Sequence, residues 1–340
     1  MSFKDTKIFK SLKKTAHGIY NRIISTPLFQ KMEVEPVTED DFLPHNKHVI
    51  EWWYFTGFLN KRFGFEVTFF KVNVPPKNFI LINPSLNTCI SHFAITDVEE
   101  NKFFYSERIR QSILMWEKKE LLLRNGAWIL ESDGSVYHIY VVSKEISLDL
   151  YMKPTSKMVL HGDRGLIKLG NAGYSYYYTY PSMETEGYIK RKGRLFKVKG
   201  ETWHDHQWGN FKVEPAWDWF SIRLTDKTYL MAFNLWDAKR KKLVIQYASL
   251  TKGDFIKKFD KFDFKVLDKD FLSGKKRYPE IWELSIEEEE INFVIEAMVK
   301  NQEVNSIITP DYYEGICKVK GKIKEKDVEG IAYVEITGYY

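Results

Sequence analysis

Alternation of hydrophobic and polar residues dominates the chain from about residue 45 to its end. The segment 63–69 reads Phe-Gly-Phe-Glu-Val-Thr-Phe, and 146–150 reads Ile-Ser-Leu-Asp-Leu. A period of two residues is typical of half-buried β-strands, because successive side chains point to opposite faces. The same reading predicts further strands at roughly 50–60, 90–97, 136–142, 174–180, 217–224, 228–236, 243–250, 281–286 and 331–337.

Short turn segments such as 99–101 and 132–134 separate these predicted strands. Helical segments of a dozen residues do not alternate with the strands, which argues against a parallel βαβ sheet. Many short strands at short spacing favour antiparallel barrels or sandwiches. A length of 340 residues exceeds one ordinary domain and predicts two.

The first thirty residues have a different period. Apolar residues recur there at intervals of three and four, with lysines mostly between them, at Phe9, Leu12, Ala16, Ile19, Tyr20, Ile23 and Ile24. This pattern predicts a basic amphipathic helix over 1–31. It can dock on an anionic membrane surface, or pack on the body of the protein with its lysines outward.

The charge distribution narrows the choice of partners. Of the formal net charge of +5, residues 1–31 carry +6 (seven basic residues and one acidic), so the remainder sums to −1. A body this close to neutral argues against nucleic-acid binding. No apolar run reaches about 18 residues, so we expect no transmembrane helix.

The amino terminus also lacks the uninterrupted apolar stretch of a secretory signal peptide. Two isolated cysteines, Cys89 and Cys317, indicate a reducing compartment rather than a disulfide framework. We therefore expect a cytoplasmic protein, peripheral at the inner membrane surface if the helix docks there.

Two segments combine more chemically active residue types than a structural strand needs. The first runs from His45 through His48 and Glu51 to Gly57, and the second is Trp-His-Asp-His-Gln-Trp-Gly at 203–209. In an extended segment, Trp203, Asp205 and Gln207 share one face, and His204, His206 and Trp208 share the other.

Apolar surroundings disfavour the charged form of a carboxyl group and raise its pKa toward the range of a general acid. We therefore expect Asp205 to be a proton donor, with His206 or His204 as its partner. Glu51 offers a second carboxylate.

Aromatic residues make up 16% of the chain, with ten Trp and twenty Tyr. Their rings can stabilise a carbocation by about 0.5–2 kcal/mol each when desolvated. This predicts alkene chemistry: protonation, then capture of the cation by water or by an internal double bond. The candidate substrate-binding residues are Trp52, Trp53, Tyr54, Tyr176, Tyr178, Trp203, Trp208, Trp217 and Trp219.

Two other readings of the same residues stay open. Trp, His and Asp can form a structural hydrogen-bond cluster that plugs a barrel. Alternatively, His204 and His206 could ligate a metal ion with Asp205, His45 or His48. Nucleotide-binding glycine motifs and the GxSxG motif are missing from the sequence, and we expect no cofactor.

The chain resembles the carotenoid 1,2-hydratase (hydroxyneurosporene synthase) and AttH-like family. The resemblance rests on Glu-Trp-Trp-Tyr at 51–54 with Gly57, on Tyr176–Pro181 and 203–209, on Trp-Asp-Trp at 217–219, and on 313–315 and 330–339. Thr179 stands where the family usually has Ser. The matches run in order to the end of the chain.

This resemblance implies two tandem lipocalin-like (calycin) antiparallel β-barrels, with a ligand site between or inside them. Known activities in the wider family include hydration of acyclic carotenoids, hydration of a prenylated plant defence compound, and Diels–Alder cyclisation of polyenes by related fungal proteins. We expect the helix at 1–31, one barrel over 32–200 and a second over 201–340.

Three functions follow from these expectations. The leading one is hydration or cyclisation of a large apolar isoprenoid, carotenoid or polyene, with Asp205, His206 and Glu51 as catalytic residues. The alternatives are a binding protein for such a ligand and a metal-dependent hydrolase.

Overall fold

The computed structural model describes residues 36–72, 87–112, 115–117, 120–169, 172–211, 216–237, 239–275, 277–307 and 309–339. The helix predicted over 1–31 lies outside these ranges and stays a prediction. None of the described helices is both long and apolar enough to cross a membrane.

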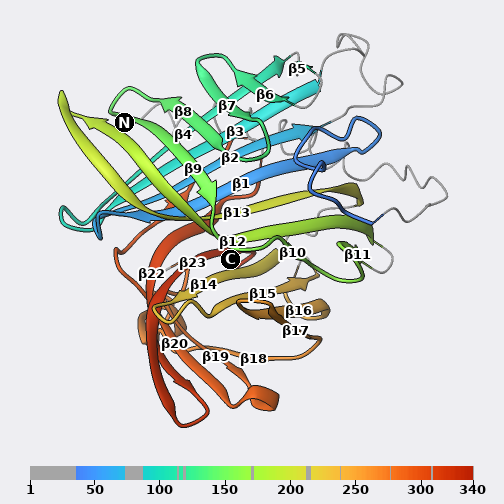
Figure 1. Ribbon diagram of the computed structural model, residues 1–340. Helices are drawn as coiled ribbons and strands as arrows, with labels where there is room; N and C mark the ends of the chain where they lie inside the picture. Colours follow the sequence, from blue (N-terminus) through green and yellow to red (C-terminus); the bar gives the residue numbers. More distant parts are fainter. Residues whose placement is uncertain are drawn as a thin grey trace.

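The first of two antiparallel sheets, sheet A, holds thirteen strands (Figure 1). Eleven of them form a continuous path: β4 (Lys102–Ser112), β3 (Asn87–Asp97), β2 (Phe63–Val72), β1 (Ile50–Leu59), β13 (Arg194–Phe211), β12 (Gly173–Arg191), β9 (Ile146–Pro154), β8 (Tyr137–Val142), β7 (Trp128–Ser132), β6 (Glu120–Asn125) and β5 (Met115–Glu117). The short strands β10 (Val159–Leu160) and β11 (Leu166–Lys168) both pair with β12.

Sheet B holds ten strands and lies below sheet A in Figure 1. Its path is β17 (Phe255–Phe259), β16 (Leu243–Lys252), β15 (Tyr229–Trp236), β14 (Ala216–Leu224), β23 (Lys326–Thr337), β22 (Tyr312–Ile323), β20 (Ile291–Ala297), β19 (Ile281–Ile286) and β18 (Asp263–Val266), with β21 (Glu303–Val304) on β22. A helical turn, α2 (Lys269–Leu272), and a 3-10 turn, η4 (Glu287–Glu289), connect strands of this sheet.

Sheet A is a nearly closed barrel and sheet B a half-barrel, which confirms the expected all-β, lipocalin-like architecture. Asn125 on β6 helps to close sheet A, because its Nδ2 donates to Ser91 Oγ at 2.9 Å and to Arg108 O at 3.0 Å across the gap. Sheet B is an open half-barrel, whereas a second complete barrel was expected.

The change of sheet falls later than the domain boundary expected after residue 200. Strand β13 pairs with β1 and β12 up to Gly209 and Phe211, so residues 201–211 belong to sheet A. The strands of sheet B begin at Ala216. The hydrophobic pattern alone does not show where the chain passes from sheet A to sheet B, because β13 and β14 are both mostly buried strands.

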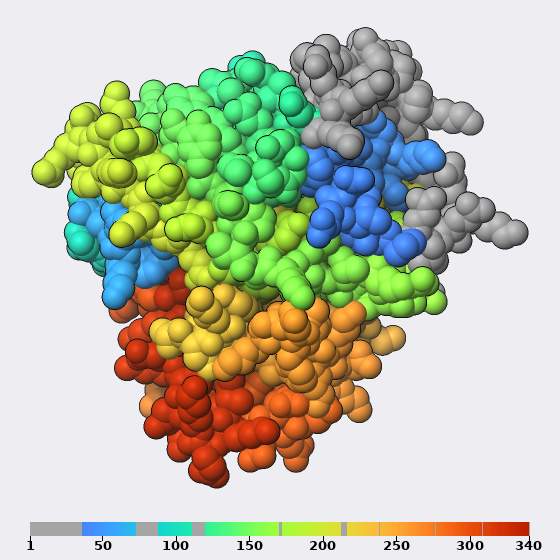
Figure 2. Space-filling view, in the orientation of Figure 1, coloured from blue at the N-terminus to red at the C-terminus, as the bar shows by residue number. Residues whose placement is uncertain are grey.

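Each sheet encloses its own apolar core, and a third apolar cluster lies between the sheets. The surface view shows the two halves in direct contact (Figure 2). Strand β1 is almost entirely buried, because one of its faces points into the sheet A barrel and the other toward sheet B. The side chains on both faces of β1 are therefore surrounded by other side chains.

Candidate functional site

Strand β13 separates the expected catalytic residues onto two faces. His204 and His206 point into the sheet A barrel, where His204 stacks on Phe55 and His206 on Trp53. Asp205 and Gln207 line a cavity between the two sheets. The division into faces that the sequence predicts is therefore present. The expected pairing of Asp205 with His206 is not formed, because adjacent residues of a strand point in opposite directions.

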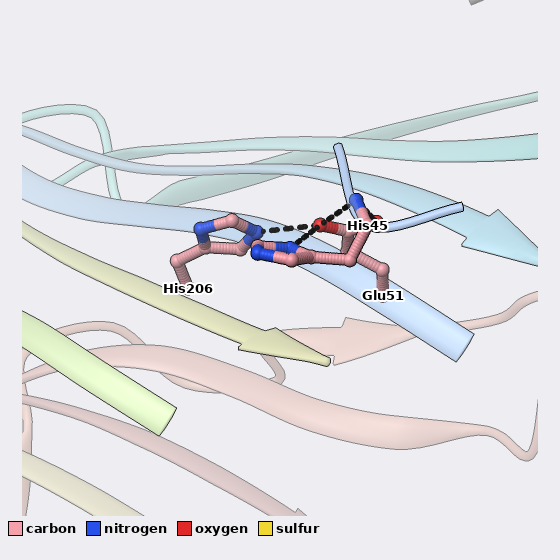
Figure 3. A group of neighbouring side chains, drawn as sticks. All are labelled: His45, Glu51 and His206. Atoms are coloured by element: carbon pink, nitrogen blue, oxygen red, sulfur yellow. Dashed lines mark hydrogen bonds and ion pairs between the residues drawn. The ribbon is translucent and has the colours of Figure 1, made fainter. Parts of the chain in front are cut away.

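On the barrel face, Glu51 is the centre of a hydrogen-bonded cluster (Figure 3). Its Oε1 lies 2.8 Å from His45 Nδ1 and 3.0 Å from His206 Nε2, and Lys71 Nζ donates to Oε2 at 2.6 Å. The His45 backbone N–H donates to the same carboxylate. Strand register explains the ion pair, since Glu51 and Lys71 are directly opposite on β1 and β2. Glu51 and Asp205 thus lie on opposite faces of sheet A. Glu51 is not the second carboxylate beside Asp205 that the sequence suggests.

The charges in this cluster follow from its neighbours. Burial favours the neutral form of Glu51, but the charge of Lys71 and the hydrogen bonds from His206 and His45 hold its pKa well below the usual range. Burial lowers the pKa of His206 to about 4. His206 is therefore a neutral imidazole that donates from Nε2 to an ionised Glu51.

His45, Glu51 and His206 are also close enough to hold a metal ion together. Their chemistry fits one poorly, because Lys71 already neutralises the carboxylate at 2.6 Å. The rings of His204 and His206 lie side by side on the barrel face, with centroids 6.4 Å apart, but Asp205 does not join them as a third ligand of the expected hydrolase site. His204 Nδ1 lies 3.1 Å from the Tyr54 carbonyl oxygen, and Asp205 is on the opposite face.

The cavity on the other face of β13 has a volume of about 170 Å³. Sheet A supplies one wall and sheet B the other. Its lining is mostly apolar and aromatic and comprises Ile50, Trp52, Tyr54, Phe70, His92, Ile167, Leu169, Tyr177, Asp205, Gln207, Phe211, Trp217, Trp219, Phe233, Leu235, Thr309, Tyr312 and Glu335. Ligand pockets of proteins are commonly apolar with a few convergent polar groups.

Asp205 is 3% exposed and is held by three uncharged donors. Trp203 Nε1 donates to Oδ1 at 2.8 Å, the Thr179 hydroxyl donates to the same oxygen, and the Tyr177 hydroxyl donates to Oδ2 at 2.8 Å. Burial raises the pKa of Asp205 to about 7, although these three hydrogen bonds act to lower it. A carboxyl group in this state can deliver a proton near neutral pH.

The expected substrate-binding aromatics are divided in the same way. Trp52, Tyr54, Trp217 and Trp219 line the cavity, and Trp203 binds Asp205 beside it. The other four belong to the barrel face, where they surround the histidines; they are Trp53, Tyr176, Tyr178 and Trp208. His48 lies edge-on to Tyr176 on that side, and burial lowers its pKa to about 4.

Sequence reasoning missed several cavity residues. Glu335 is the most notable, because it is a second carboxyl group in the same cavity. The alternation of 174–180 could have placed Tyr177 and Thr179 together, on the face opposite Tyr176 and Tyr178. His92, outside the two segments that the sequence singles out, is buried and lines the cavity. Glu335, on β23, carried no signal of its own beyond the motif at 330–339.

Comparisons with known proteins agree with this architecture. A family model described as AttH-like matches residues 33–339. Kievitone hydratase from Fusarium solani subsp. phaseoli is 24% identical over 230 residues, which cover 63% of this chain and 63% of that protein. The match thus spans less than two thirds of the length of that enzyme.

Two solved structures share the fold. A protein from Nitrosomonas europaea assigned as AttH has a TM-score of 0.75 at 24% identity, covering 93% of this chain and 100% of that chain. Kievitone hydratase from Nectria haematococca has a TM-score of 0.68 at 20% identity, covering 89% and 93%. Because the family model matches nearly its whole length, the chain belongs to the AttH-like family.

Proposed function

We propose that the protein is a hydratase that adds water to a carbon–carbon double bond of an apolar, isoprenoid-like substrate. The observation that carries this proposal is Asp205, a buried carboxyl group with a pKa of about 7 that faces an aromatic cavity. The similarity to kievitone hydratase supports the same class of reaction.

In the proposed reaction, the double bond lies in the cavity against Asp205. The carboxyl O–H proton moves to one alkene carbon, and the other carbon becomes a cation. Trp52, Tyr54 and Trp219 present rings to the same cavity, and each can stabilise the cation by about 0.5–2 kcal/mol. Water then forms the new C–O bond and keeps one hydrogen in the product hydroxyl group. Its other hydrogen leaves as a proton and restores the Asp205 carboxyl group.

The test uses kievitone and an acyclic carotenoid as probes. We expect the wild-type protein to convert one of them to a product heavier by one water molecule, detected by mass spectrometry. We expect Asp205→Asn to lower kcat by about 100-fold to 10,000-fold, the usual range for loss of a general acid. Equal rates for Asp205→Asn and wild type would contradict the acid role. An isomer of unchanged mass would instead indicate cyclisation, with an internal double bond capturing the cation.

A second candidate function is binding without chemistry. The three donors that hold Asp205 also suit a purely structural carboxyl group, which favours this reading. It predicts that the purified protein retains an apolar ligand unchanged, visible by mass spectrometry of a solvent extract. Recovery of a hydrated ligand from protein incubated with kievitone would count against it.

A further inference from the structure

The cavity contains a second carboxyl group on the wall that faces Asp205. Glu335 comes from β23 in sheet B, whereas Asp205 comes from β13 in sheet A. Among the described residues that line the cavity, these two alone are acidic. The cavity is therefore bounded by one carboxyl group on each sheet.

A short chain of contacts connects the two groups. Glu335 is directly opposite Trp219 in the β14–β23 pairing. Trp219 Nε1 donates to the Tyr177 hydroxyl at 3.2 Å, and that hydroxyl donates to Asp205 Oδ2 at 2.8 Å. Both carboxyl groups are thus connected through Trp219, Glu335 by strand register and Asp205 through the Tyr177 hydroxyl.

Glu335 is more open to the cavity than Asp205. Trp217 Nε1 donates to its Oε1 at 2.8 Å, and none of the described residues donates to Oε2. The side chain is half-buried, whereas Asp205 is buried. A carboxylate with a free oxygen that faces the cavity can accept a hydrogen bond from a water molecule held there.

The electrostatics favour one proton on the pair. Burial raises the pKa of Glu335 to about 7, the hydrogen bond from Trp217 lowers it, and the charge of Asp205 raises it. Like charges in one site resist simultaneous ionisation, so the charge of one carboxyl group favours the protonated form of the other. An acid and a base in a single cavity are the two groups that water addition requires.

We propose that Glu335 is the general base that activates the water molecule, with Asp205 as the acid. This inference rests on the proposed function. The Asp205 proton moves to one alkene carbon, the water oxygen bonds to the cationic carbon, and the second water proton moves to the Glu335 carboxylate. A proton then returns from Glu335 to Asp205 through water, so the enzyme is regenerated and the net change is addition of H₂O.

Other glutamates are less suited to this role. Both oxygens of Glu51 accept hydrogen bonds on the barrel face of sheet A. Glu314 is fully buried, accepts from the Tyr54 hydroxyl at 2.9 Å, and does not line the cavity. Among the glutamates in the described part of the chain, Glu335 alone combines a cavity position with an available oxygen.

The test compares Glu335→Gln with Asp205→Asn, using kievitone in D₂O. Glu329→Gln is the matched control, because Glu329 is an exposed glutamate on the same strand. We expect Glu335→Gln to lower the hydration rate at least about 100-fold. Deuterium should still enter the recovered substrate, because Asp205 still protonates the alkene and the cation returns to it. Asp205→Asn should lose both hydration and deuterium uptake.

The outcomes separate this inference from the proposed function. Hydration by Glu335→Gln within about threefold of Glu329→Gln would overturn the base role while leaving the hydratase intact. Absence of both hydration and deuterium uptake in the wild type would overturn the hydratase, and the base role with it.

A second measurement needs no substrate. In protein with ¹³C-labelled aspartate carboxyls, Glu335→Gln should lower the pKa of Asp205, because it removes the charge of the ionised base. An unchanged pKa of Asp205 would contradict the pair.

Discussion

Two buried carboxyl groups, Glu51 of β1 on the barrel face of sheet A and Asp205 of β13 on the cavity face, have pKa values shifted in opposite directions. On the barrel face, Glu51 has a pKa well below its usual range, and on the cavity face the pKa of Asp205 is raised to about 7. Burial is the largest influence on both groups and favours the neutral form of each. Burial alone therefore does not decide whether a carboxyl group inside this protein keeps its proton.

The difference lies in the donors around each carboxyl group. Glu51 faces Lys71 at 2.6 Å, whereas the donors to Asp205 are an indole, a phenol and an alcohol. A charged partner compensates for burial, and neutral donors do so only in part. We infer that the barrel face is a structural ion cluster and the cavity face the site of proton transfer.

The largest expected effect on stability comes from breaking the ion cluster. Lys71→Met leaves the Glu51 carboxylate buried without its cation, so we expect a loss of about 3–5 kcal/mol in the free energy of unfolding. Denaturant titration followed by tryptophan fluorescence measures this loss. Glu51→Gln combined with Lys71→Met should restore part of it. A single Lys71→Met variant as stable as wild type would contradict a structural role for the cluster.

The next effect is a pH dependence of stability that originates on the cavity face. The pKa of Asp205 is higher in the folded protein than its ordinary value of 3.8, so its contribution is complete below about pH 4 and is lost as pH rises to about 7. A shift from 3.8 to about 7 corresponds to up to about 4 kcal/mol.

Unfolding free energies of wild type and Asp205→Asn between pH 4 and 8 test this dependence. The wild-type stability should fall more steeply with rising pH than that of the variant. Parallel curves would show that Asp205 titrates normally.

A smaller effect is expected when one neutral donor is removed. Tyr177→Phe deletes the hydroxyl that donates to Asp205 Oδ2 at 2.8 Å and lowers the pKa of Asp205. One such hydrogen bond contributes about 0.5–1.5 kcal/mol, which corresponds to roughly half to one pKa unit. The alkaline limb of the pH–rate profile should therefore move upward by that amount. A downward movement would mean that Tyr177 stabilises the neutral acid instead.

The strands, and the face on which each residue lies, could largely be predicted from the sequence, because the alternation of hydrophobic and polar residues is a local property. The period of two places Asp205 and His206 on opposite faces of one strand. The same geometry prevents the two side chains from pairing, so the expected partnership between them is wrong. The Glu51–Lys71 ion pair was harder to foresee, since it depends on the register of the β1–β2 hairpin.

Glu335 could not be assigned in this way. It reaches the cavity only because β23 pairs with β14 in a second sheet that packs on the first, a contact between strands far apart in the chain. The change of sheet after Phe211 depends on the same long-range pairing. Hydrophobic pattern predicts strands and their faces, but not which faces meet across two sheets.

The most direct test of this comparison is the protonation state of the two carboxyl groups in one sample. Protein with ¹³C-labelled aspartate and glutamate carboxyls can be titrated by NMR from pH 4 to 8, with Asp205→Asn and Glu51→Gln used to assign the signals. We predict that at pH 6 Asp205 is mostly protonated and Glu51 is ionised. An ionised Asp205 at pH 6, or a Glu51 that titrates near neutral pH, would contradict the division between a structural face and a reactive one.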